Sequence, residues 1–417
     1  MSTLTGTTPA KPVGKAFIIA WALGCCFYFL EYVVRSSPAV MIPELSGRLG
    51  MTPLALSAVL GAYYYTYSVT SLVAGVALDH AGAKFPVSIG IGVLALGCIL
   101  FSMPLYVTAE TGRLLQGAGS AFAFTGCVYL ASHGFSPRTM ATAIGLTQCI
   151  GMLGGSAGQF VVGPLIKGGL PAGSFWIILG AICGVICVAL FFIIPKEESQ
   201  VFHGSVVMSM LTPYKIVFSN LQSWLSGVIS GLLFAPTTVF AMTWGVAFFQ
   251  QDRGLGYEPA VVTCSMVSLG WVVGCPLLGW ISDRMGRRKP ALSGGIAVMI
   301  VCLAQLCFLP SLLPPLVTML VMGIASGAAM IPYTIIKEAN PDNVKGSATG
   351  GQNFITFGIT AIIGPIFSSS YGKTLAGATD HAAHFQQAVL FFLITTVLAL
   401  VVSLCIGETG HAKQARI

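Results

Sequence analysis

The sequence predicts an all-α membrane protein with twelve transmembrane helices arranged as two related six-helix halves. Three observations support this prediction. Hydrophobic residues make up 55% of the 417-residue chain and charged residues only 8%, a composition not found in soluble globular domains. Apolar runs of about twenty residues, long enough to cross a hydrocarbon core, recur along the chain. Sequence motifs from the first half also return in the second half.

The apolar runs are expected to be helices, because lipid offers no hydrogen-bond partner to a free backbone group. Their expected centres are Phe27, Val69, Leu94, Phe122, Met152, Ile182, Leu233, Val267, Ala297, Met322, Ile359 and Ile394. The first run is too long for the apolar region of a signal peptide, so we expect it to remain as the first helix.

Basic residues are unequally distributed when the spans are threaded alternately through a bilayer. One set of loops, together with both termini, holds fourteen of them, and the opposite loops hold four: Arg48, Lys167, Arg253 and Lys373. Because basic loops stay on the cytoplasmic side, both termini are predicted to be cytoplasmic, in a bacterial-type inner membrane. The net charge of +7 follows from this topology, and no nucleic-acid partner is expected.

The remaining chemistry of the sequence does not favour an enzyme. The twelve cysteines lie almost entirely within the apolar runs, so neither a disulfide framework nor a metal site is expected. The chain has no phosphate-binding glycine loop and no nucleophile motif. We therefore expect no cofactor and no catalysis. The protein is also expected to work as a monomer in the bilayer.

An internal repeat relates the two halves. Gly75-Val-Ala-Leu-Asp79-His-Ala-Gly82-Ala-Lys84 follows the second span, and Gly279-Trp-Ile-Ser-Asp283-Arg-Met-Gly286-Arg-Arg288-Lys289 follows the eighth. The two aspartates are 204 residues apart, and a second pair of motifs, ending at Gly145 and Gly350, is offset by 205. This duplication predicts bundles at 1–194 and 221–417, joined by a cytoplasmic linker at 195–220 with one interfacial helix.

These motifs resemble those of the major facilitator superfamily. The second loop copy matches the family signature Gly-x-x-x-Asp-(Arg/Lys)-x-Gly-(Arg/Lys)-(Arg/Lys) at every position, whereas the first has His80 and Ala83 where basic residues are usual. A second family signature, Arg-x-x-x-Gly-x-Gly, is present from Arg113 to Gly119. The resemblance implies a secondary transporter that works by alternating access, with two bundles rocking about a central site.

The loop motif suggests a conformational latch. An aspartate at a helix end can face the positive N-terminus of a neighbouring helix and pair with nearby cations. We expect such a latch, closing the cytoplasmic side, from Asp79, Lys84, Asp283, Arg284, Arg287 and Arg288. The alternative is that the cations only fix the topology, although this explains the two matched aspartates poorly. Glu338, near a helix end, is expected to be solvated.

Two charges lie within the first span. Glu31 and Arg35 are expected roughly 22 and 28 Å from its cytoplasmic end at the rise of an α-helix. Ionisable groups at such depth are costly, which makes them candidates for function. The alternative is that Arg35 extends to the outer interface and Glu31 neutralises it from one turn away.

Arg113, early in the fourth span, supplies a second cation in the same half of the bilayer. Two guanidinium groups suit a carboxylate, sulfonate or phosphate. The arrangement resembles the anion-transporting branches of the superfamily, which implies that Arg35 and Arg113 hold a substrate carboxylate. In proton-coupled members a glutamate follows the fourth-helix arginine by two turns, but Ser120 stands there. This departure argues against proton symport of that kind; if protons are coupled, Glu31 is the expected proton site.

Other polar groups are candidates for substrate contact. Gln148 and Asn353 are offset by 205 residues, so the repeat places two amides at equivalent positions. From the tyrosine run at 63–65 we select Tyr64 or Tyr65, and from the seventh span Trp244, although aromatic rows serve packing more often than recognition.

The expected function is transport of a small organic anion of the carboxylate type, by proton-coupled uptake or by exchange. Three alternatives remain open: a polyspecific drug/proton efflux antiporter, an uptake permease for siderophores or amino acids, and a sensor without transport activity.

Overall fold

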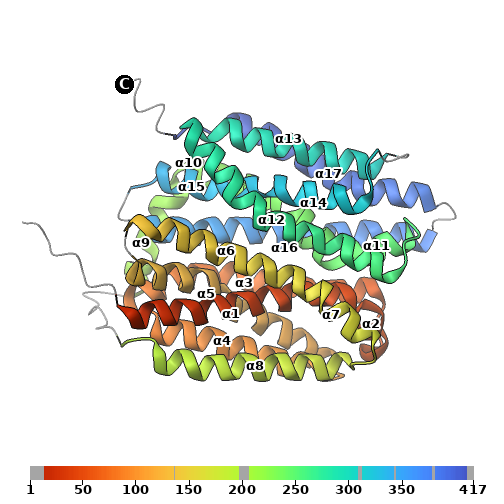
Figure 1. The fold of residues 1–417 in the computed structure, drawn as a ribbon, viewed down its shortest axis with the longest axis horizontal. Helices are drawn as coiled ribbons and strands as arrows, with labels where there is room; N and C mark the ends of the chain where they lie inside the picture. The colour runs from red at the N-terminus through yellow and green to blue at the C-terminus, as the bar shows by residue number, and fades with distance from the viewer. Residues whose placement is uncertain are drawn as a thin grey trace, which may run out of the picture.

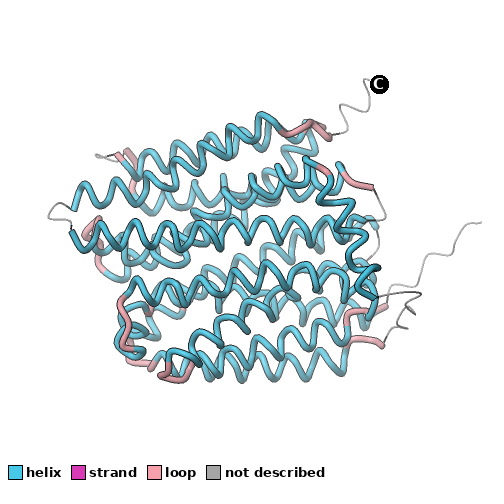
Figure 2. The backbone as a smooth tube through the Cα atoms, turned by 180° about the vertical axis from the view of Figure 1, so that it is seen from behind, coloured by secondary structure: helices cyan, strands magenta, loops and turns pink. Residues whose placement is uncertain are grey.

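The structure is a computed structural model that describes residues 14–135, 137–196, 206–308, 312–341, 344–377 and 381–410. Every regular element among these residues is a helix, and the long helices run side by side along the longest axis of the molecule (Figure 1). The view from behind shows the same arrangement (Figure 2). Each of the twelve expected centres falls in a different helix or chain of consecutive helices.

The first bundle contains six spanning units. They are α1 (Lys15–Ser36) with the 3-10 segment η1 (Ser37–Val40), α3 (Pro53–Ala81), α4 (Lys84–Phe101), α5 (Tyr106–Gly134), α6 (Pro137–Phe160) with α7 (Val162–Lys167), and α8 (Ala172–Ile193); the short α2 (Ile42–Leu49) precedes α3. Thr52 caps α3, because its hydroxyl accepts a 3.2 Å hydrogen bond from the Ala55 amide. Pro53 occupies the first turn, where no amide hydrogen is needed.

The second bundle repeats this pattern. Its units are α10 (Leu221–Ala235) with the π-helix η2 (Pro236–Trp244) and α11 (Gly245–Gln251), α12 (Tyr257–Met285), α13 (Arg288–Cys307), α14 (Pro315–Ser326) with the 3-10 segment η3 (Gly327–Met330) and α15 (Ile331–Ala339), α16 (Lys345–Gly377), and α17 (His381–Cys405). The first unit of each bundle thus contains a non-α segment, and π-helical segments often occur at functional sites.

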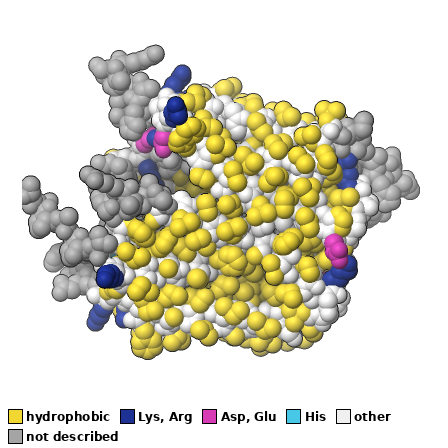
Figure 3. Space-filling view, viewed as in Figure 1, with side chains coloured by type: hydrophobic (Ala, Val, Ile, Leu, Met, Phe, Trp, Pro, Cys, Tyr) yellow, Lys and Arg dark blue, Asp and Glu magenta, His cyan; other side chains and the backbone are white. Residues whose placement is uncertain are grey.

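The outer surface fits a bilayer. Ten of the units are long and apolar enough to cross a membrane, and α3, with 29 residues, and α17, with 25, complete the twelve. In Figure 3 apolar side chains cover the middle of the visible face, and charged side chains lie at its two ends. Exposed apolar side chains include Val185, 70% exposed, and Leu404, 66% exposed, as expected where the neighbour is lipid.

Both copies of the repeated loop motif end a helix at a glycine with a positive φ angle. Gly82, which ends α3, has a φ angle of 68°, and Gly286, which ends α12, has a φ angle of 61°. Residues with a Cβ rarely adopt a positive φ angle. The ψ angles differ, −176° at Gly82 and 16° at Gly286, so only Gly286 has the left-handed helical conformation. Both motif copies therefore require a glycine at the end of the helix, although the backbone leaves the two helices with different ψ angles.

The bundles meet along two helix pairs, α3 with α16 and α6 with α12. In the first pair the Ser68 hydroxyl donates a 2.6 Å hydrogen bond to the Phe354 carbonyl. In the second pair the Ser156 hydroxyl donates a 3.3 Å hydrogen bond to the Ser265 carbonyl. We call the end of the molecule where α1 begins and α17 finishes the termini end. The opposite end carries α2, α7 and α11 (Figure 1).

The linker contains the helix expected from the sequence, α9 (Val206–Ser219). It lies at the termini end, where Val217 packs with Ile336, Val344 and Ala348 of the second bundle. Its Tyr214 hydroxyl donates a 2.7 Å hydrogen bond to the Leu72 carbonyl of the first bundle. The linker helix therefore contacts both bundles.

Candidate functional site

Glu31 and Arg35 lie one turn apart on α1 and form a fully buried ion pair. Arg35 donates to Glu31 through Nη2, and the Tyr63 hydroxyl of α3 donates to the same carboxylate oxygen. The other Glu31 oxygen and the Nε and Nη1 atoms of Arg35 are buried without a hydrogen-bond partner. The expected alternative, in which Arg35 extends to the interface, is wrong, because Arg35 is only 2% exposed.

Aromatic rings surround the Arg35 guanidinium. Its central carbon lies 4.5 Å from the ring centre of Tyr32, 5.0 Å from Tyr67 and 5.0 Å from Phe357. The ring of Tyr63 is 5.4 Å away and that of Tyr64 is 5.9 Å away. Cation–π attraction to these ring faces stabilises a desolvated guanidinium.

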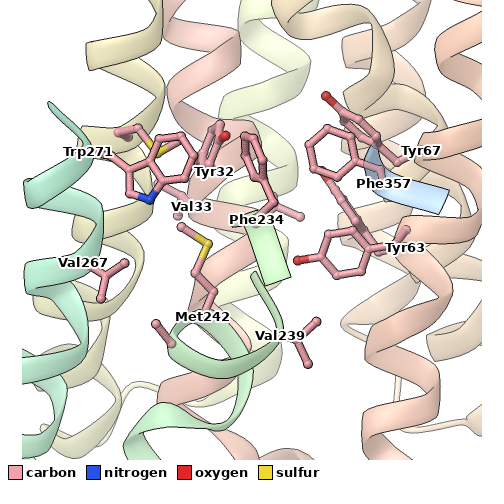
Figure 4. Packing of buried hydrophobic residues seen from close by; sticks show 14 of the residues in the cluster. Tyr32, Val33, Tyr63, Tyr67, Phe234, Val239, Met242, Val267, Trp271 and Phe357 are labelled. Carbon is pink, nitrogen blue, oxygen red and sulfur yellow. The ribbon is translucent and has the colours of Figure 1, made fainter. Parts of the chain in front are cut away.

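This ring cluster joins the two bundles. Phe357 belongs to α16, and its ring packs on Tyr67 of α3 at 4.5 Å and on Phe234 of α10 at 5.5 Å. Figure 4 shows Tyr63, Tyr67 and Phe357 together, with Phe234 on the side toward Trp271. The Arg35 site therefore lies at the contact between bundles, where a relative movement would change its surroundings.

Arg113 of α5 is the second buried cation, also 2% exposed. Its guanidinium donates to Gln116 at 2.7 Å and to the carbonyls of Val34 and Leu60 at 3.3 Å. Its central carbon lies 5.0 Å from the ring centre of Tyr63. One ring thus contacts both arginines, and Arg113 is held largely by the protein, with only its Nε atom buried and unpartnered.

The two symmetry-related amides each pair with a tyrosine. The Tyr28 hydroxyl donates to the Gln148 amide oxygen at 3.2 Å, and the Tyr333 hydroxyl donates to the Asn353 amide oxygen at 2.6 Å. The amide nitrogens of Gln148 and Asn353 are buried without a partner. Tyr28 packs edge-on against Tyr32, which connects the first amide to the Arg35 ring cluster.

The other two aromatic candidates have different positions. Tyr64 belongs to the cluster and is 5% exposed, but Tyr65 is 46% exposed and lies outside it. The choice of Tyr65 is corrected for a geometric reason: a step of one residue turns the side chain by about 100° around a helix. Trp244, at the end of η2, is buried and donates to the Ser368 hydroxyl at 3.3 Å.

A pocket of 690 Å³ opens between the bundles at the opposite end. Its lining includes Val40, Glu44 and Thr52 from the first bundle and Trp244, Gln250 and Tyr257 from the second. We call it the vestibule. Its lining reaches Val40 and Trp244, the last residues of η1 and η2, and these two segments contact each other. Arg35 lies two residues before η1 begins.

Beside the vestibule, α12 is bonded to the first bundle. The Tyr257 hydroxyl lies 2.9 Å from the Val40 carbonyl and 3.2 Å from the Gly163 carbonyl. Lys167 and Glu258 form an ion pair of 2.7 Å whose side chains are mostly exposed. Solvent screens such an exposed pair, so it contributes little to stability, and Tyr257 is the firmer of these connections.

Comparison with known proteins decides the family. The sequence model of the Major Facilitator Superfamily matches residues 24–365. The chain belongs to the Major Facilitator Superfamily. It is 23% identical to the hexuronate transporter of Bacillus subtilis over 399 residues, 90% of each chain. It is 25% identical over 294 residues to a Cupriavidus necator protein named "Probable sulfoacetate transporter SauU", covering 63% of this chain and 64% of that one.

Solved structures give the same result for the fold. A bacterial homologue of the human lysosomal transporter Spinster superposes with a TM-score of 0.68 at 14% identity, over 95% of this chain and 97% of that one. Membership of the Major Facilitator Superfamily makes this chain a multi-pass membrane transporter and not an enzyme. Among the described residues no group of three or more metal-binding side chains occurs.

The superfamily loop motif has partners within the second bundle. Arg288 lies between Asp283, at 2.5 Å, and Glu338, at 2.7 Å. Arg287 lies 3.9 Å from Glu408, and Arg284 stacks on the Trp280 ring at 5.2 Å. The expectation that Glu338 is solvated is wrong, because its side chain is 23% exposed and paired with Arg288. Helix α15 places Glu338 beside Arg288.

In the first motif copy, Lys84 lies 5.1 Å from the ring centre of Phe191 on α8. The side chain of Asp79 lies outside the part of the structure that is described. Glu408, after α17, accepts hydrogen bonds from the backbone amides of Arg288 and Lys289. Burial opposes the ionisation of Glu408, but four backbone amide donors outweigh it and lower the pKa of the carboxyl.

Sequence reasoning missed several residues that complete the site of this superfamily member. They are Tyr28, Tyr32, Tyr63, Tyr67, Gln116, Tyr333 and Phe357. A signal existed for some of them: Tyr28 and Tyr32, and also Tyr63 and Tyr67, are spaced by four residues and so share one helix face. Phe357 had no such signal, because only the contact between bundles places it at Arg35.

Proposed function

We propose that this protein transports a small organic anion, binding the anionic group at Arg35. One observation carries the proposal: a guanidinium with two unpartnered donors is buried at the contact between the bundles. Buried charged donors need partners, and an oxyanion supplies two strong acceptors. The relatives named for hexuronate and sulfoacetate have anionic substrates by name, which agrees with this assignment.

Arg113 and the amides have supporting parts in the proposal. Arg113 adds a second positive charge behind the Tyr63 ring, and its free Nε can meet an approaching anion. Gln148 and Asn353 have unpartnered amide nitrogens, from one bundle each. These donors suit the uncharged polar part of the substrate. Tyr64 and Trp244 contribute ring faces along the path from the vestibule.

Glu31 is proposed as the site of proton coupling. It is the only carboxylate that is fully buried in the described part of the chain, and it holds Arg35. Substrate would bind the two free donors of Arg35 while Glu31 is ionised, and a proton on Glu31 would then weaken the Glu31–Arg35 pair. Proton and substrate would then cross together when the bundles rock, which is symport.

The orientation and the latch complete the proposal. The termini end is the cytoplasmic end of an inner-membrane protein, and the moving units are 1–194 and 221–417, joined by 195–220. Asp79, Lys84, Asp283, Arg284, Arg287 and Arg288 form the cytoplasmic latch. Arg288 organises its second copy through Asp283 and Glu338.

The substrate class is tested first by binding. Purified protein is screened by thermal shift against organic acids, amino acids, siderophores and lipophilic drug cations, because a ligand of the folded state raises its melting temperature. We expect stabilisation by organic acids and its loss in Arg35→Ala. Stabilisation by drug cations alone would replace the proposal with an efflux pump.

Transport is then measured in proteoliposomes with an imposed pH gradient. Arg35→Ala is expected to abolish uptake, and Arg35→Lys, which keeps the charge without the planar donors, to restore only a part of it. Lys215→Ala, an exposed cation on α9, is the control. Glu31→Gln is expected to keep exchange but lose gradient-driven accumulation. Wild-type uptake by Arg35→Ala would refute the anion site, and wild-type accumulation by Glu31→Gln would refute the proton site.

A further inference from the structure

The charges buried at the site can be counted. Among the described residues, four charged side chains are less than 9% exposed: Glu31, Arg35, Arg113 and Arg288. Arg288 belongs to the ion-pair group with Asp283 and Glu338 near the termini end. The Arg35 site therefore holds two guanidinium groups and one carboxylate. The other titratable groups around it include the phenols of Tyr28, Tyr32, Tyr63, Tyr64, Tyr67 and Tyr333. The thiol of Cys98, which accepts from Gln116 at 3.6 Å, lies there too. Phenols and thiols are both largely uncharged at physiological pH.

The site consequently has an excess of one positive charge when Glu31 is ionised. Within the described part of the chain no counter-ion is buried beside Arg113, whose contacts there are Gln116, two carbonyls and two rings. An uncompensated charge in a low-dielectric interior is costly, and an opposite charge of equal size removes most of that cost. One negative charge on the substrate balances the site, and two would exceed it.

We infer that Glu31 determines the valence of the anion, so that this site selects a hydroxylated monocarboxylate over a dianion of the same skeleton. The inference rests on the proposed function and adds the substrate class to it. Glu31 acts as a resident negative charge that occupies the place of a second substrate charge. Without it, the site has two excess positive charges and suits a dianion.

The uncharged surroundings indicate the rest of the substrate. Gln148, 5% exposed, and Asn353, 2% exposed, each have an amide nitrogen without a partner. They come from opposite bundles, and neither bundle places a further buried cation beside them among the described residues. Neutral donors of this kind pair with hydroxyl oxygens. The ring faces of Tyr32, Tyr67 and Phe357 suit the apolar faces of a carbon chain or ring.

The test compares two probes that share a six-carbon hydroxylated skeleton, D-glucuronate with one carboxylate and D-glucarate with two. Binding to the full-length protein is measured by calorimetry at pH 7.5 without any gradient. We expect wild type to prefer glucuronate and Glu31→Gln to shift the affinity ratio toward glucarate by roughly tenfold, since one charge at this distance is worth about 1.4 kcal/mol or more.

Two further variants keep the test decisive. Glu31→Asp retains the charge and should keep the wild-type ratio, which separates charge from shape. Glu110→Gln removes a partly exposed carboxylate three residues before Arg113 on α5 and should also keep it. The inference is wrong, while the anion site stands, if folded Glu31→Gln has the same glucuronate-to-glucarate affinity ratio as wild type. It is also wrong if wild type prefers glucarate. If neither probe binds wild type at millimolar concentration but another organic acid stabilises the protein in the thermal-shift screen, the inference fails and the anion site stands; if no organic acid binds, both fail.

Discussion

The hydroxyl of Tyr214, on the linker helix α9, donates a 2.7 Å hydrogen bond to the carbonyl of Leu72 on α3. Gly350 of α16 makes room for the same hydroxyl, because a Cβ there would lie 2.9 Å from it. One side chain of the linker thus lies in the seam between α3 and α16, where the bundles meet at the termini end. The linker is therefore part of the closure at this end, in addition to connecting the bundles.

Tyr214→Phe should weaken this closure. The substitution removes one hydrogen bond, worth about 1 kcal/mol, so the open population at the termini end should rise roughly fivefold. Spin labels on the termini ends of α3 and α16 would report it as a longer distance in pulsed resonance spectra. Tyr106→Phe, on the exposed part of α5, is the control. Unchanged distance distributions in Tyr214→Phe would show that the linker does not hold the closure.

Tyr63→Phe should reduce substrate affinity while the protein remains folded. The ring between Arg35 and Arg113 stays, but Glu31 loses its hydroxyl donor. The expected effect is about tenfold, the size of one hydrogen bond to a charged group. Tyr65→Phe, two positions further on the same helix, should have no effect, because Tyr65 lies outside the cluster. Equal losses in both variants would contradict the assignment of Tyr63 to the site.

Gly117→Ala should destabilise the fold strongly. A Cβ at this position of α5 would lie 2.0 Å from the Tyr63 carbonyl, which belongs to a helix backbone and cannot move alone. Overpacking against backbone typically costs about 1–3 kcal/mol, occasionally more. Gly61→Ala, on α3, meets no atom within 4 Å and is the control. Thermal unfolding in detergent compares the two, and a melting temperature of Gly117→Ala within one degree of wild type would contradict the packing argument.

Glu408→Gln should lower stability at neutral pH but not in acid. The pKa of Glu408 is lowered in the folded protein by backbone amide donors, so its ionised form stabilises the folded state above the unfolded pKa. That contribution disappears as the pH falls through the lower, folded pKa. Melting temperatures of wild type and Glu408→Gln should therefore differ at neutral pH and converge as the pH falls below the lowered, folded pKa. Glu44→Gln, an exposed carboxylate on α2, should match wild type throughout.

The sequence predicted the large features of this protein because they depend on composition and spacing. Long apolar runs require helices in lipid, and motifs 204 residues apart require related halves. The same holds for the Glu31 and Arg35 pair, since residues four apart on a helix face each other.

The tertiary structure alone decided what surrounds those charges. Phe357 reaches Arg35 from 322 positions away in the chain, and Glu338 reaches Arg288 from 50 away. Tyr65 faces outward while Tyr64 faces the cluster, because the rotation of α3 is set by its contacts with α5 and α16. A helix can be predicted from its own residues, but which of its faces meets which neighbour depends on packing between segments that are distant in sequence.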